Sequence, residues 1–394
     1  MMLPFVQLKK GKEHSVLRKH PWIFSGAVQK STPNIAQGHV VDVLQYDGRI
    51  LGRGHYQHGG SIVVRILTFD DRLIDAGFWN YTLQKAYDFR QKLGLISDQT
   101  NAFRLIHGEG DLLPGLVVDI YANIAVIQCH SIGMYLQRKE IANAILLACK
   151  IKNMSIYCKA KDTLPAIYAN QCEDGFIEGE LSETTVLENG HRFTVNVVEG
   201  QKTGFFLDQR ENRFYLSQLA QGKRILNTFC YTGGFSVYAL GAGAVEVDSV
   251  DSSGKAMILT DKNVALNQVT GIHQSFTENV LTFFQKEGLD PYDIVVVDPP
   301  AFAKSLTKRH NAIQAYKRLN MAALQKVKAG GFLFTFSCSQ VVNTQLFYDT
   351  IVAAGLESGR HIRVVRHLSQ GADHPVNLFH PEGHYLKGLL VYVE

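Results

Sequence analysis

The sequence predicts an α/β protein in which a mainly parallel sheet with helices on its faces follows two smaller domains. Three observations predict this: short strands separated by turns up to residue 70, one helical period after them, and alternation of strands with helices from Gly200 onward. We therefore expect a β-barrel at 1–70, a linker helix at 71–100, an α+β domain at 101–199 and the parallel-sheet domain at 200–394.

The first two regions are predicted from turn chemistry and hydrophobic period. The Asp47-Gly48 turn between apolar-alternating segments is typical of a β-hairpin. The strands beside and after it are expected at Val40–Leu44, Ile50–His55 and Ser61–Leu67. Apolar residues spaced at threes and fours from Phe78 to Leu93 predict the linker helix.

The later elements alternate between strands and helices. In the central domain we expect one helix at 135–148 and strands at 115–120, 124–128, 155–158 and 193–198. In the last domain we expect a helix at 236–240 and strands at 224–229, 245–250, 273–276, 294–297 and 332–336. Parallel strands place their carboxyl ends at one edge of a sheet, where α/β proteins bind ligands. The residues that follow these strands are therefore the first candidates for function.

The composition argues against a membrane protein and a disulfide-rich secreted protein. Of the 394 residues 46% are apolar and 19% charged, and no stretch approaches the roughly 18 consecutive apolar residues of a membrane helix. The apolar start, Met1–Leu8, is too short for a signal peptide. The six cysteines include no CxxC pair, so neither disulfides nor a metal site is indicated. We therefore expect a cytoplasmic protein with no membrane and no metal partner.

Positive charge is concentrated near the N-terminus. The formal net charge is only +4, but residues 1–30 carry six lysines and arginines against the single acid Glu13. This bias suits a polyanion. A solvated charged surface gives the same pattern, and that alternative stays open.

A glycine turn, Tyr231-Thr232-Gly233-Gly234, follows the first strand of the parallel domain. Its two glycines let the backbone approach a ligand closely, and the start of the next helix offers unpaired amides. Asp251 ends the following strand, where a carboxylate can accept both hydroxyls of a ribose. Because the full G-x-G-x-x-G of a dinucleotide site is missing, the pattern favours S-adenosylmethionine. A simple tight turn and a helix cap at Asp251 are the alternatives.

Two further strand ends carry polar residues. Glu278 and Asn279 follow the third strand and could contact the amine of an adenine, or be an ordinary polar strand end. Asp298 follows the fourth strand, and Pro299 and Pro300 stiffen its loop while removing amide donors. A rigid loop with an exposed carboxylate suits the edge of a base, although the prolines could also be nothing more than a strand terminator.

Cys338 follows the fifth strand, between two serines. A buried structural cysteine is the usual case, but a thiol at a strand's carboxyl end beside polar neighbours has the access to ionise. Adding a thiolate to C6 of a cytosine makes C5 nucleophilic enough to take a methyl group, after which C5 loses its proton and the thiol leaves. The spacing of Asp298 and Cys338 therefore indicates a covalent methylation of a base.

With their neighbours, these residues make the chain resemble the ribosomal RNA large-subunit cytosine-5 methyltransferases that carry an N-terminal PUA domain. The resemblance runs along the whole chain. Its marks before the parallel domain are Arg18–Gly26, Phe103–Ile106, Gly108-Glu109, Asp111–Gly115 and Lys202–Arg210. In the parallel domain they are Tyr231–Phe235, Val250-Asp251, Asp298–Phe302, Phe336–Ser339, Asp373–Pro375 and Pro381–Gly383.

The resemblance implies a PUA-type RNA-binding barrel and a Rossmann-like class I methyltransferase domain with a mainly parallel, seven-stranded sheet. It implies that Cys338 attacks C6, that Asp298 contacts the cytosine, and that the Gly233 turn with Asp251 holds S-adenosylmethionine. It also suggests that Gln209 and Arg210 lie near the cofactor or the RNA. A surface helix start capped by Asp208 is the alternative for these two residues.

Residues of the basic N-terminus and of the loop after Asp298 are expected to contact the RNA. They are Lys9, Lys10, Lys12, Arg18, Lys19, Pro300 and Phe302, with Pro299 assigned to the cofactor side. Trp22 could stack on a base, but its setting in Pro21-Trp22-Ile23-Phe24 favours the barrel core.

Three departures from the family pattern limit what can be carried over. Ala301 stands where some members have lysine, Cys230 takes a serine-like position, and Glu278-Asn279 replaces a pair of aspartates. The adenine contact is therefore the least secure of the expected contacts.

The sequence thus predicts a methyltransferase that acts on C5 of a cytosine in naked or partly assembled large-subunit ribosomal RNA. Alternatives are a methyltransferase that acts on a guanine nitrogen, and a non-catalytic RNA-binding ribosome assembly factor. A nicotinamide dehydrogenase is disfavoured by the missing glycine. The oligomeric state is open and includes a homodimer.

Overall fold

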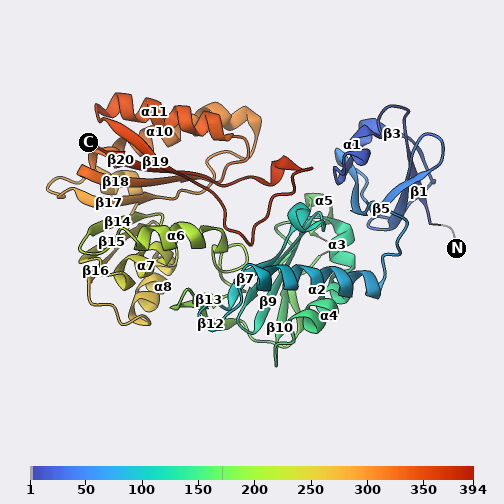
Figure 1. Cartoon of the computed structure of the whole chain (residues 1–394), viewed down its shortest axis with the longest axis horizontal. Helices are drawn as coiled ribbons and strands as arrows, with labels where there is room; N and C mark the ends of the chain where they lie inside the picture. Colours follow the sequence, from blue (N-terminus) through green and yellow to red (C-terminus); the bar gives the residue numbers. More distant parts are fainter. Residues whose placement is uncertain (1–2, 171) are drawn as a thin grey trace. The chain divides into compact units, whose positions relative to one another are not determined.

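The computed structural model describes residues 3–170 and 172–394, which form two compact units (Figure 1). The first unit contains the chain up to Val186 together with Val195–Phe205 and Ala372–Gly383. The second contains Leu187–Thr194, Phe206–Gly371 and His384–Glu394. The predicted barrel, linker helix and central domain therefore share one unit, and their division at residues 70, 100 and 199 stays a prediction.

A six-stranded sheet begins the first unit, in the order β2-β6-β5-β4-β1-β3. Its strands are β1 (Phe5–Leu8), β2 (Trp22–Phe24), β3 (Val28–Ser31), β4 (Val40–Leu44), β5 (Ile50–Tyr56) and β6 (Ile62–Thr68), with a short helix α1 (His14–Leu17) after β1. Apolar residues of alternating strand positions, such as Val41, Val43 and Val64, form its core. The hairpin predicted at Asp47-Gly48 joins β4 to β5, whose strands pair antiparallel.

A second core lies around a five-stranded sheet in the order β11-β10-β9-β8-β7. Its strands are β7 (Ala102–His107), β8 (Leu116–Tyr121), β9 (Ile124–Cys129), β10 (Ser155–Cys158) and β11 (Gly175–Glu178). Its helices are α2 (Ala76–Lys92), α3 (Ile132–Leu136), α4 (Arg138–Cys149) and α5 (Ala166–Ala169). The single helix expected at 135–148 is wrong in one respect, because the chain breaks at Gln137 into α3 and α4.

Two strands, β12 (Glu183–Glu188) and β13 (His191–Asn196), pair with each other where the chain passes from the first unit to the second.

The second unit is built on a seven-stranded sheet in the order β16-β15-β14-β17-β18-β20-β19. The strands are β14 (Arg224–Thr228), β15 (Glu246–Asp251), β16 (Ile272–Thr277), β17 (Tyr292–Val297), β18 (Val327–Ser337), β19 (Ile362–Leu368) and β20 (Lys387–Val393). The first five are parallel, and β20 lies antiparallel between β18 and β19. The predicted mainly parallel, seven-stranded fold is confirmed.

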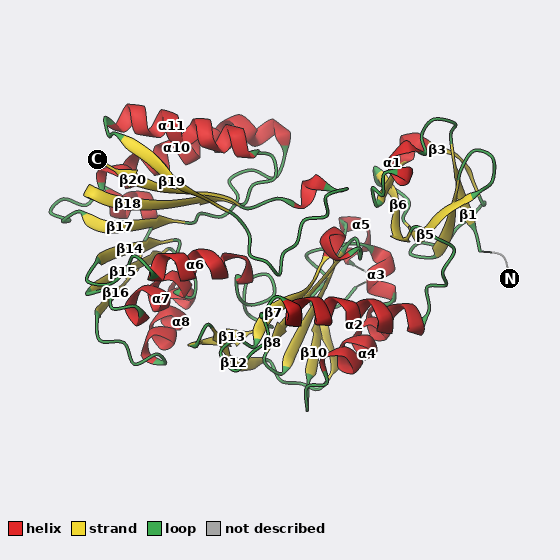
Figure 2. Ribbon diagram, viewed as in Figure 1, coloured by secondary structure: helices red, strands yellow, loops and turns green. Residues whose placement is uncertain are grey.

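Helices cover both faces of this sheet, as Figure 2 shows. On one side lie α6 (Arg210–Ser217), α7 (Gly234–Gly241) and α8 (Gly254–Ala265), and on the other α10 (Arg309–Gln325) and α11 (Thr344–Ser358). The short helix α9 (Val280–Phe284) contacts α10. Buried side chains of α9, α10 and α11 pack with the strands into one core. Among the described residues, no helix combines the length and the apolar character needed to cross a membrane.

Candidate active site

The glycine turn after β14 is held in an unusual backbone conformation. Gly233 has φ +76°, and a Cβ built on it would lie 2.7 Å from the Cγ2 atom of Thr260 on α8. The same helix holds the turn through two side chains: the Thr260 hydroxyl donates to the Tyr231 carbonyl at 2.8 Å, and the Asn263 amide donates to the Thr232 carbonyl at 2.9 Å. Only glycine fits this position without strain, so the sequence signal at Gly233 has a steric cause.

Asp251 lies at the end of β15, beside this turn. Its two carboxylate oxygens accept hydrogen bonds from the amides of Tyr231 at 3.1 Å and Ser253 at 2.9 Å. A carboxylate has about four acceptor sites, so both oxygens keep capacity for hydroxyl donors. The cap of α8 is Ser253, whose side chain accepts from the Ala256 amide, so the alternative of a helix cap at Asp251 is wrong. A half-buried carboxylate beside a glycine turn suits a ribose.

Glu278 and Asn279 follow β16 and already have local partners. Glu278 forms an ion pair with Lys286, with 2.5 Å between Oε2 and Nζ. The Asn279 side chain caps α9 by accepting from the amides of Leu281 and Thr282. The polar strand end is therefore accounted for by local structure, and an adenine contact by these two residues stays a prediction.

Asp298 and Cys338 come to the same edge of the sheet because β17 and β18 are neighbours in parallel register. Val297 pairs with Thr335, so the chain leaves β17 at Asp298 beside the place where it leaves β18. The two following loops are joined by a hydrogen bond from the Ser339 hydroxyl to the Ala303 carbonyl, at 2.8 Å. This bond couples the Asp298 loop to the Cys338 loop.

Cys338 differs from the other cysteines in its exposure. It is half-buried, whereas Cys129, Cys149, Cys158, Cys172 and Cys230 are buried. Burial also raises the pKa of the Cys149 and Cys230 thiols well above the ordinary value, which keeps them protonated. A cysteine with access to a substrate is the one that can act as a nucleophile.

Lys387 is a residue of this edge that the sequence reasoning missed. It begins β20 opposite Ser337 and is only 4% exposed. Its Nζ donates to the carbonyls of Ser339 at 2.7 Å and Tyr385 at 2.6 Å. Burial lowers the pKa of Lys387 from 10.5 to about 8, while the nearby Cys338 thiol acts in the opposite direction. A lone lysine in the apolar strand from Leu386 to Val393 was the signal that could have revealed it.

Tyr316 on α10 is a second residue that the sequence reasoning missed. Its side chain is fully buried and packs on Phe302, with 4.6 Å between ring centroids. Burial raises its pKa to about 12, and the charges of Cys338 and Asp298 act in the same direction. The phenol therefore stays neutral beside these two residues.

Gln209 and Arg210 lie at the start of α6, and both are 3% exposed, so the alternative of a surface helix start is wrong. The Arg210 guanidinium lies 3.3 Å from the buried carboxylate of Glu188. Arg213 donates to the same carboxylate from Nε and Nη2 at 2.7–2.9 Å, and the Tyr238 hydroxyl donates to it at 3.0 Å. Gln209 accepts from the Asn212 amide at 2.6 Å. A contact of Gln209 or Arg210 with cofactor or RNA stays a prediction.

The predicted RNA contacts divide between the two units. In the first unit all five basic residues, Lys9, Lys10, Lys12, Arg18 and Lys19, are exposed. In the second unit Pro300 is exposed and Phe302 is half-buried, while Pro299 is buried.

Trp22 is not the core residue that its motif suggested. It is half-buried, its indole Nε1 donates to Glu109 at 2.9 Å, and its ring packs against His380 at 4.3 Å. Ile23 fills the core in its place. Successive strand residues point to opposite faces, so only one of the two can enter the core.

One group of side chains in the first unit has the composition of a metal site: His20, His380 and Glu382, whose ligand atoms lie within 4.8 Å of one another. However, Nδ1 of His20 accepts the Trp22 amide at 3.2 Å. A neutral His20 therefore carries its proton on Nε2, the atom that faces Glu382, and that proton takes the lone pair a metal would need.

Comparison with known proteins gives two family matches. Residues 163–366 match the family model of S-adenosylmethionine-dependent methyltransferases, and residues 6–69 match the PUA-like domain. Proteins named ribosomal RNA large subunit methyltransferase I from Shewanella amazonensis and Aeromonas hydrophila are 37% and 38% identical to this chain. The alignments cover 98% of this chain in both cases, and 99% and 98% of those relatives.

Two solved structures share the fold. A candidate S-adenosylmethionine-dependent methyltransferase from Streptococcus mutans superposes with a TM-score of 0.83 at 23% identity, and Trm5b from Pyrococcus abyssi with 0.53 at 15%. Each comparison covers 100% of both chains. At these identities the likeness concerns the fold alone.

Proposed function

The chain belongs to the S-adenosylmethionine-dependent methyltransferases, in the family of ribosomal RNA large subunit methyltransferase I, and on this premise we propose that it methylates C5 of a cytosine in large-subunit ribosomal RNA. The observation that carries the proposal is Cys338: a half-buried thiol at the carboxyl edge of β18, beside the loop of Asp298. Methylation of an exocyclic or ring nitrogen has no use for such a thiol. Methylation of C5, which is a poor nucleophile, needs one.

In the proposed reaction, S-adenosylmethionine supplies a methyl group on a positively charged sulfur. The Cys338 thiolate would form a bond to C6 of the cytosine, which moves electron density to C5. C5 would then take the methyl group as the bond between that carbon and the donor sulfur breaks, and the electron pair of that bond stays on the sulfur. Loss of the C5 proton to a base then restores the ring, and the C6–S bond breaks to release the thiolate. Asp298 would hold the edge of the cytosine. Its charge and that of Cys338 both raise the pKa of the Tyr316 hydroxyl.

Lys387 has a role in this proposal as a positioning residue. Its ammonium donates to the carbonyl of Ser339, directly after the nucleophile, and its charge favours a thiolate at Cys338 over a thiol. The two backbone carbonyls that it binds satisfy the buried ammonium without neutralising its charge.

The cofactor is proposed to lie over the carboxyl ends of β14 and β15. Gly233, Gly234, Tyr231 and Thr232 form the turn that approaches it, and the Asp251 carboxylate accepts from its ribose. Glu278 and Asn279, Asp298 and Pro299, and Gln209 and Arg210 are the further proposed contacts.

The RNA is proposed to reach the site from the loop after β17, where Pro300 and Phe302 lie, and to contact the basic residues of the PUA-like domain. The target base must leave its stack, at a cost of a few kcal/mol, which favours an unpaired nucleotide in naked or partly assembled RNA.

Replacement of Cys338 by alanine tests the proposal. Wild type and Cys338→Ala are incubated with a large-subunit ribosomal RNA transcript and methyl-labelled cofactor, and the products are mapped by mass spectrometry. We expect at least about a 1,000-fold loss of methyl transfer, because a nucleophile is removed, with unchanged cofactor affinity by calorimetry. The control Cys149→Ala removes a buried thiol and is expected to retain activity.

A trapped adduct gives an independent test. With 5-fluorocytosine in the RNA, the C5 substituent cannot leave as a proton, so the bond between Cys338 and C6 should persist after denaturation. An active Cys338→Ala variant would defeat the covalent mechanism, and a label on a guanine nitrogen would favour the other kind of methyltransferase. Absence of any cofactor binding would favour the assembly factor.

A further inference from the structure

A long segment around the two candidate catalytic residues contains no acidic side chain. Between Asp298 and Asp349 the sequence has no aspartate and no glutamate. Its basic residues, apart from His310, are Lys304, Lys308, Arg309, Lys317, Arg318, Lys326 and Lys328. The segment includes both loops of the proposed site and the helix α10 between them, so its charge is carried by the site itself.

Three of the seven lysines and arginines have partners away from the proposed site, and Arg318, in the middle of α10, is exposed. Lys328, at the start of β18, lies 3.2 Å from the carboxylate of Asp293, and Lys326 donates to a backbone carbonyl. Lys317, along α10, pairs with Glu357 at 2.8 Å. These three side chains serve local structure.

The three cations on the loop after β17 and at the start of α10 have no such partners in the described part of the chain. Lys304, Lys308 and Arg309 are exposed, and their side chains have no hydrogen-bond or ion-pair partner within 3–170 and 172–394. They lie on the loop that follows Asp298 and on the first residue of α10. Three exposed cations so close in sequence give this edge a local positive charge, of which the single carboxylate of Asp349 can offset only one unit.

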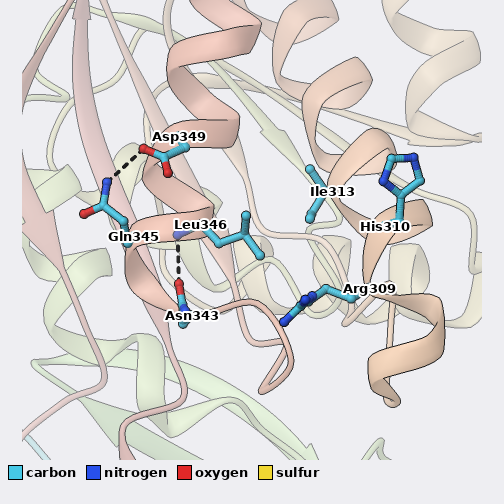
Figure 3. Close-up of a pocket in the computed structure, with 7 residues that line it drawn as sticks. All are labelled: Arg309, His310, Ile313, Asn343, Gln345, Leu346 and Asp349. Carbon is cyan, nitrogen blue, oxygen red and sulfur yellow. Dashed lines mark hydrogen bonds between the residues drawn. The ribbon is translucent and has the colours of Figure 1, made fainter.

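A pocket of about 450 Å³ adjoins this loop, between the starts of α10 and α11 (Figure 3). Arg309, His310 and Ile313 line it from α10, and Asn343, Gln345, Leu346 and Asp349 from the chain that follows Cys338. Figure 3 shows the Arg309 guanidinium extending toward the start of α11. The carboxylate of Asp349, the one acid that lines the pocket, accepts from the Gln345 amide at 2.8 Å and keeps its negative charge.

We propose that Lys304, Lys308 and Arg309 form a rim that binds the phosphates of the RNA strand next to the target cytosine, a proposal that rests on the proposed function. A base that leaves its stack needs its flanking backbone held, and phosphate contacts fix position without reading sequence. The rim begins six residues after Asp298 in the sequence, on the loop that leaves β17 at the proposed base contact. Several cations close together match the repeated phosphates of a nucleic-acid strand. A single acidic side chain of a protein partner could pair with only one of them.

Two triple variants distinguish binding of RNA by the rim itself from general attraction between RNA and a positively charged protein. The rim variant is Lys304→Gln, Lys308→Gln and Arg309→Gln, and the control is Lys317→Gln, Lys326→Gln and Lys328→Gln. Both remove three positive charges from the same acid-free segment of the full chain. Binding of a protein-free large-subunit ribosomal RNA transcript is measured over a series of salt concentrations, with cofactor affinity as the check on folding.

We expect the rim variant to bind the RNA at least about tenfold more weakly. The fall of log affinity with log salt should become less steep by about 2, because each lost phosphate contact removes about 0.7 from the magnitude of that slope. The control should change affinity less than about threefold. A second measurement maps where 4-thiouridine in the same RNA crosslinks, and the peptide containing Lys304–Arg309 should carry the label.

Equal losses of RNA affinity in the two triple variants, or an unchanged salt slope in the rim variant, would overturn the proposal. Unchanged RNA affinity in the rim variant would also overturn it, and would point to an acidic protein as the partner of these cations. The readout needs no catalysis. If C5 methylation itself proved wrong, wild type would bind RNA and fail in the product assay, which is a different result from failure of the rim.

Discussion

The second unit contains two buried charged centres that differ in the partners of their cations: a carboxylate in one, and only backbone carbonyls in the other. At the start of α6, Arg210 and Arg213 are held against the carboxylate of Glu188, and all three side chains are at most 3% exposed. At the carboxyl edge of β18, Lys387 is equally buried but is held by the carbonyls of Ser339 and Tyr385, and no carboxylate pairs with it among the described residues.

The difference separates structural charge from charge that is available for chemistry. At the first centre the Glu188 carboxylate offsets one of the two guanidinium charges at close range, so Arg213 with Glu188 contributes to the packing of α6. A buried ammonium that binds only neutral carbonyls keeps its full charge and can stabilise an anion beside it. We therefore expect variants of the first centre to change stability, and variants of the second to change the reactivity of Cys338.

The largest effect is expected at the first centre. Glu188→Ala leaves two buried guanidinium groups without their carboxylate, which should lower the free energy of unfolding by about 3–5 kcal/mol in urea titrations. The matched control is Glu357→Gln, which breaks the more exposed pair with Lys317 and should cost less than about 1 kcal/mol. Equal losses in both variants would mean that the buried centre has no special structural role.

An intermediate effect is expected at the second centre. In Lys387→Met the pH midpoint for alkylation of Cys338 by iodoacetamide should rise by about 1–2 pH units, because a nearby cation has been removed. Lys387→Arg should keep the midpoint near that of wild type. The rate at each pH is followed by mass spectrometry of the Cys338 peptide.

The pH dependence of this effect has a definite sign. The pKa of Lys387 is about 8, so wild type loses the ammonium above that pH, and the difference between wild type and Lys387→Met should shrink there. Between pH 8 and the ordinary value of 10.5 the unfolded chain binds more protons at this lysine, so its contribution to the unfolding free energy rises with pH. A midpoint that is the same in both proteins would remove Lys387 from the mechanism.

The smallest effect is expected where the first centre touches the glycine turn. A Cβ on Gly234 would lie 3.0 Å from Cδ of Arg213, so Gly234→Ala must move that side chain by a few tenths of an ångström. Alanine also gains about 1 kcal/mol of helix propensity, so the free energy of unfolding should change by less than about 1 kcal/mol. Cofactor affinity, measured by calorimetry, should fall a few-fold. An unchanged affinity would show that Arg213 does not support the turn.

Much of the fold could be predicted because its signals are local. The strand at Val40–Leu44 and the one at Ser155–Cys158 are found where their apolar patterns predicted them, and the family resemblance is confirmed by the matches to both domains. The break between α3 and α4 could not be predicted, because the apolar period continues through Gln137. The strands β19 and β20 were missed, although Gly388–Val393 is apolar, because a local pattern does not reveal that a strand joins a parallel sheet in the antiparallel direction.

The candidate site residues that could be named from the sequence are those that lie at the end of a predicted strand. Gly233, Asp251, Asp298 and Cys338 follow successive parallel strands, and parallel strands necessarily end at one edge. Trp22 was misjudged in its burial, because the face that a side chain takes depends on partners distant in sequence, here Glu109. For Arg210 only the alternative of a surface helix start is wrong, because its partner Glu188 is also distant in sequence.

By itself, the sequence determined the fold class, the family, the cofactor class and those strands whose apolar pattern is local, because these depend on short-range pattern and chemistry. Only the tertiary structure decided which charge lies beside the thiol. Lys387 and Ser339 are 48 residues apart, and they meet because β20 inserts antiparallel next to β18 and brings the lysine opposite Ser337. The insertion is driven by burial of both strands' apolar side chains, a long-range property that no local pattern around either residue encodes.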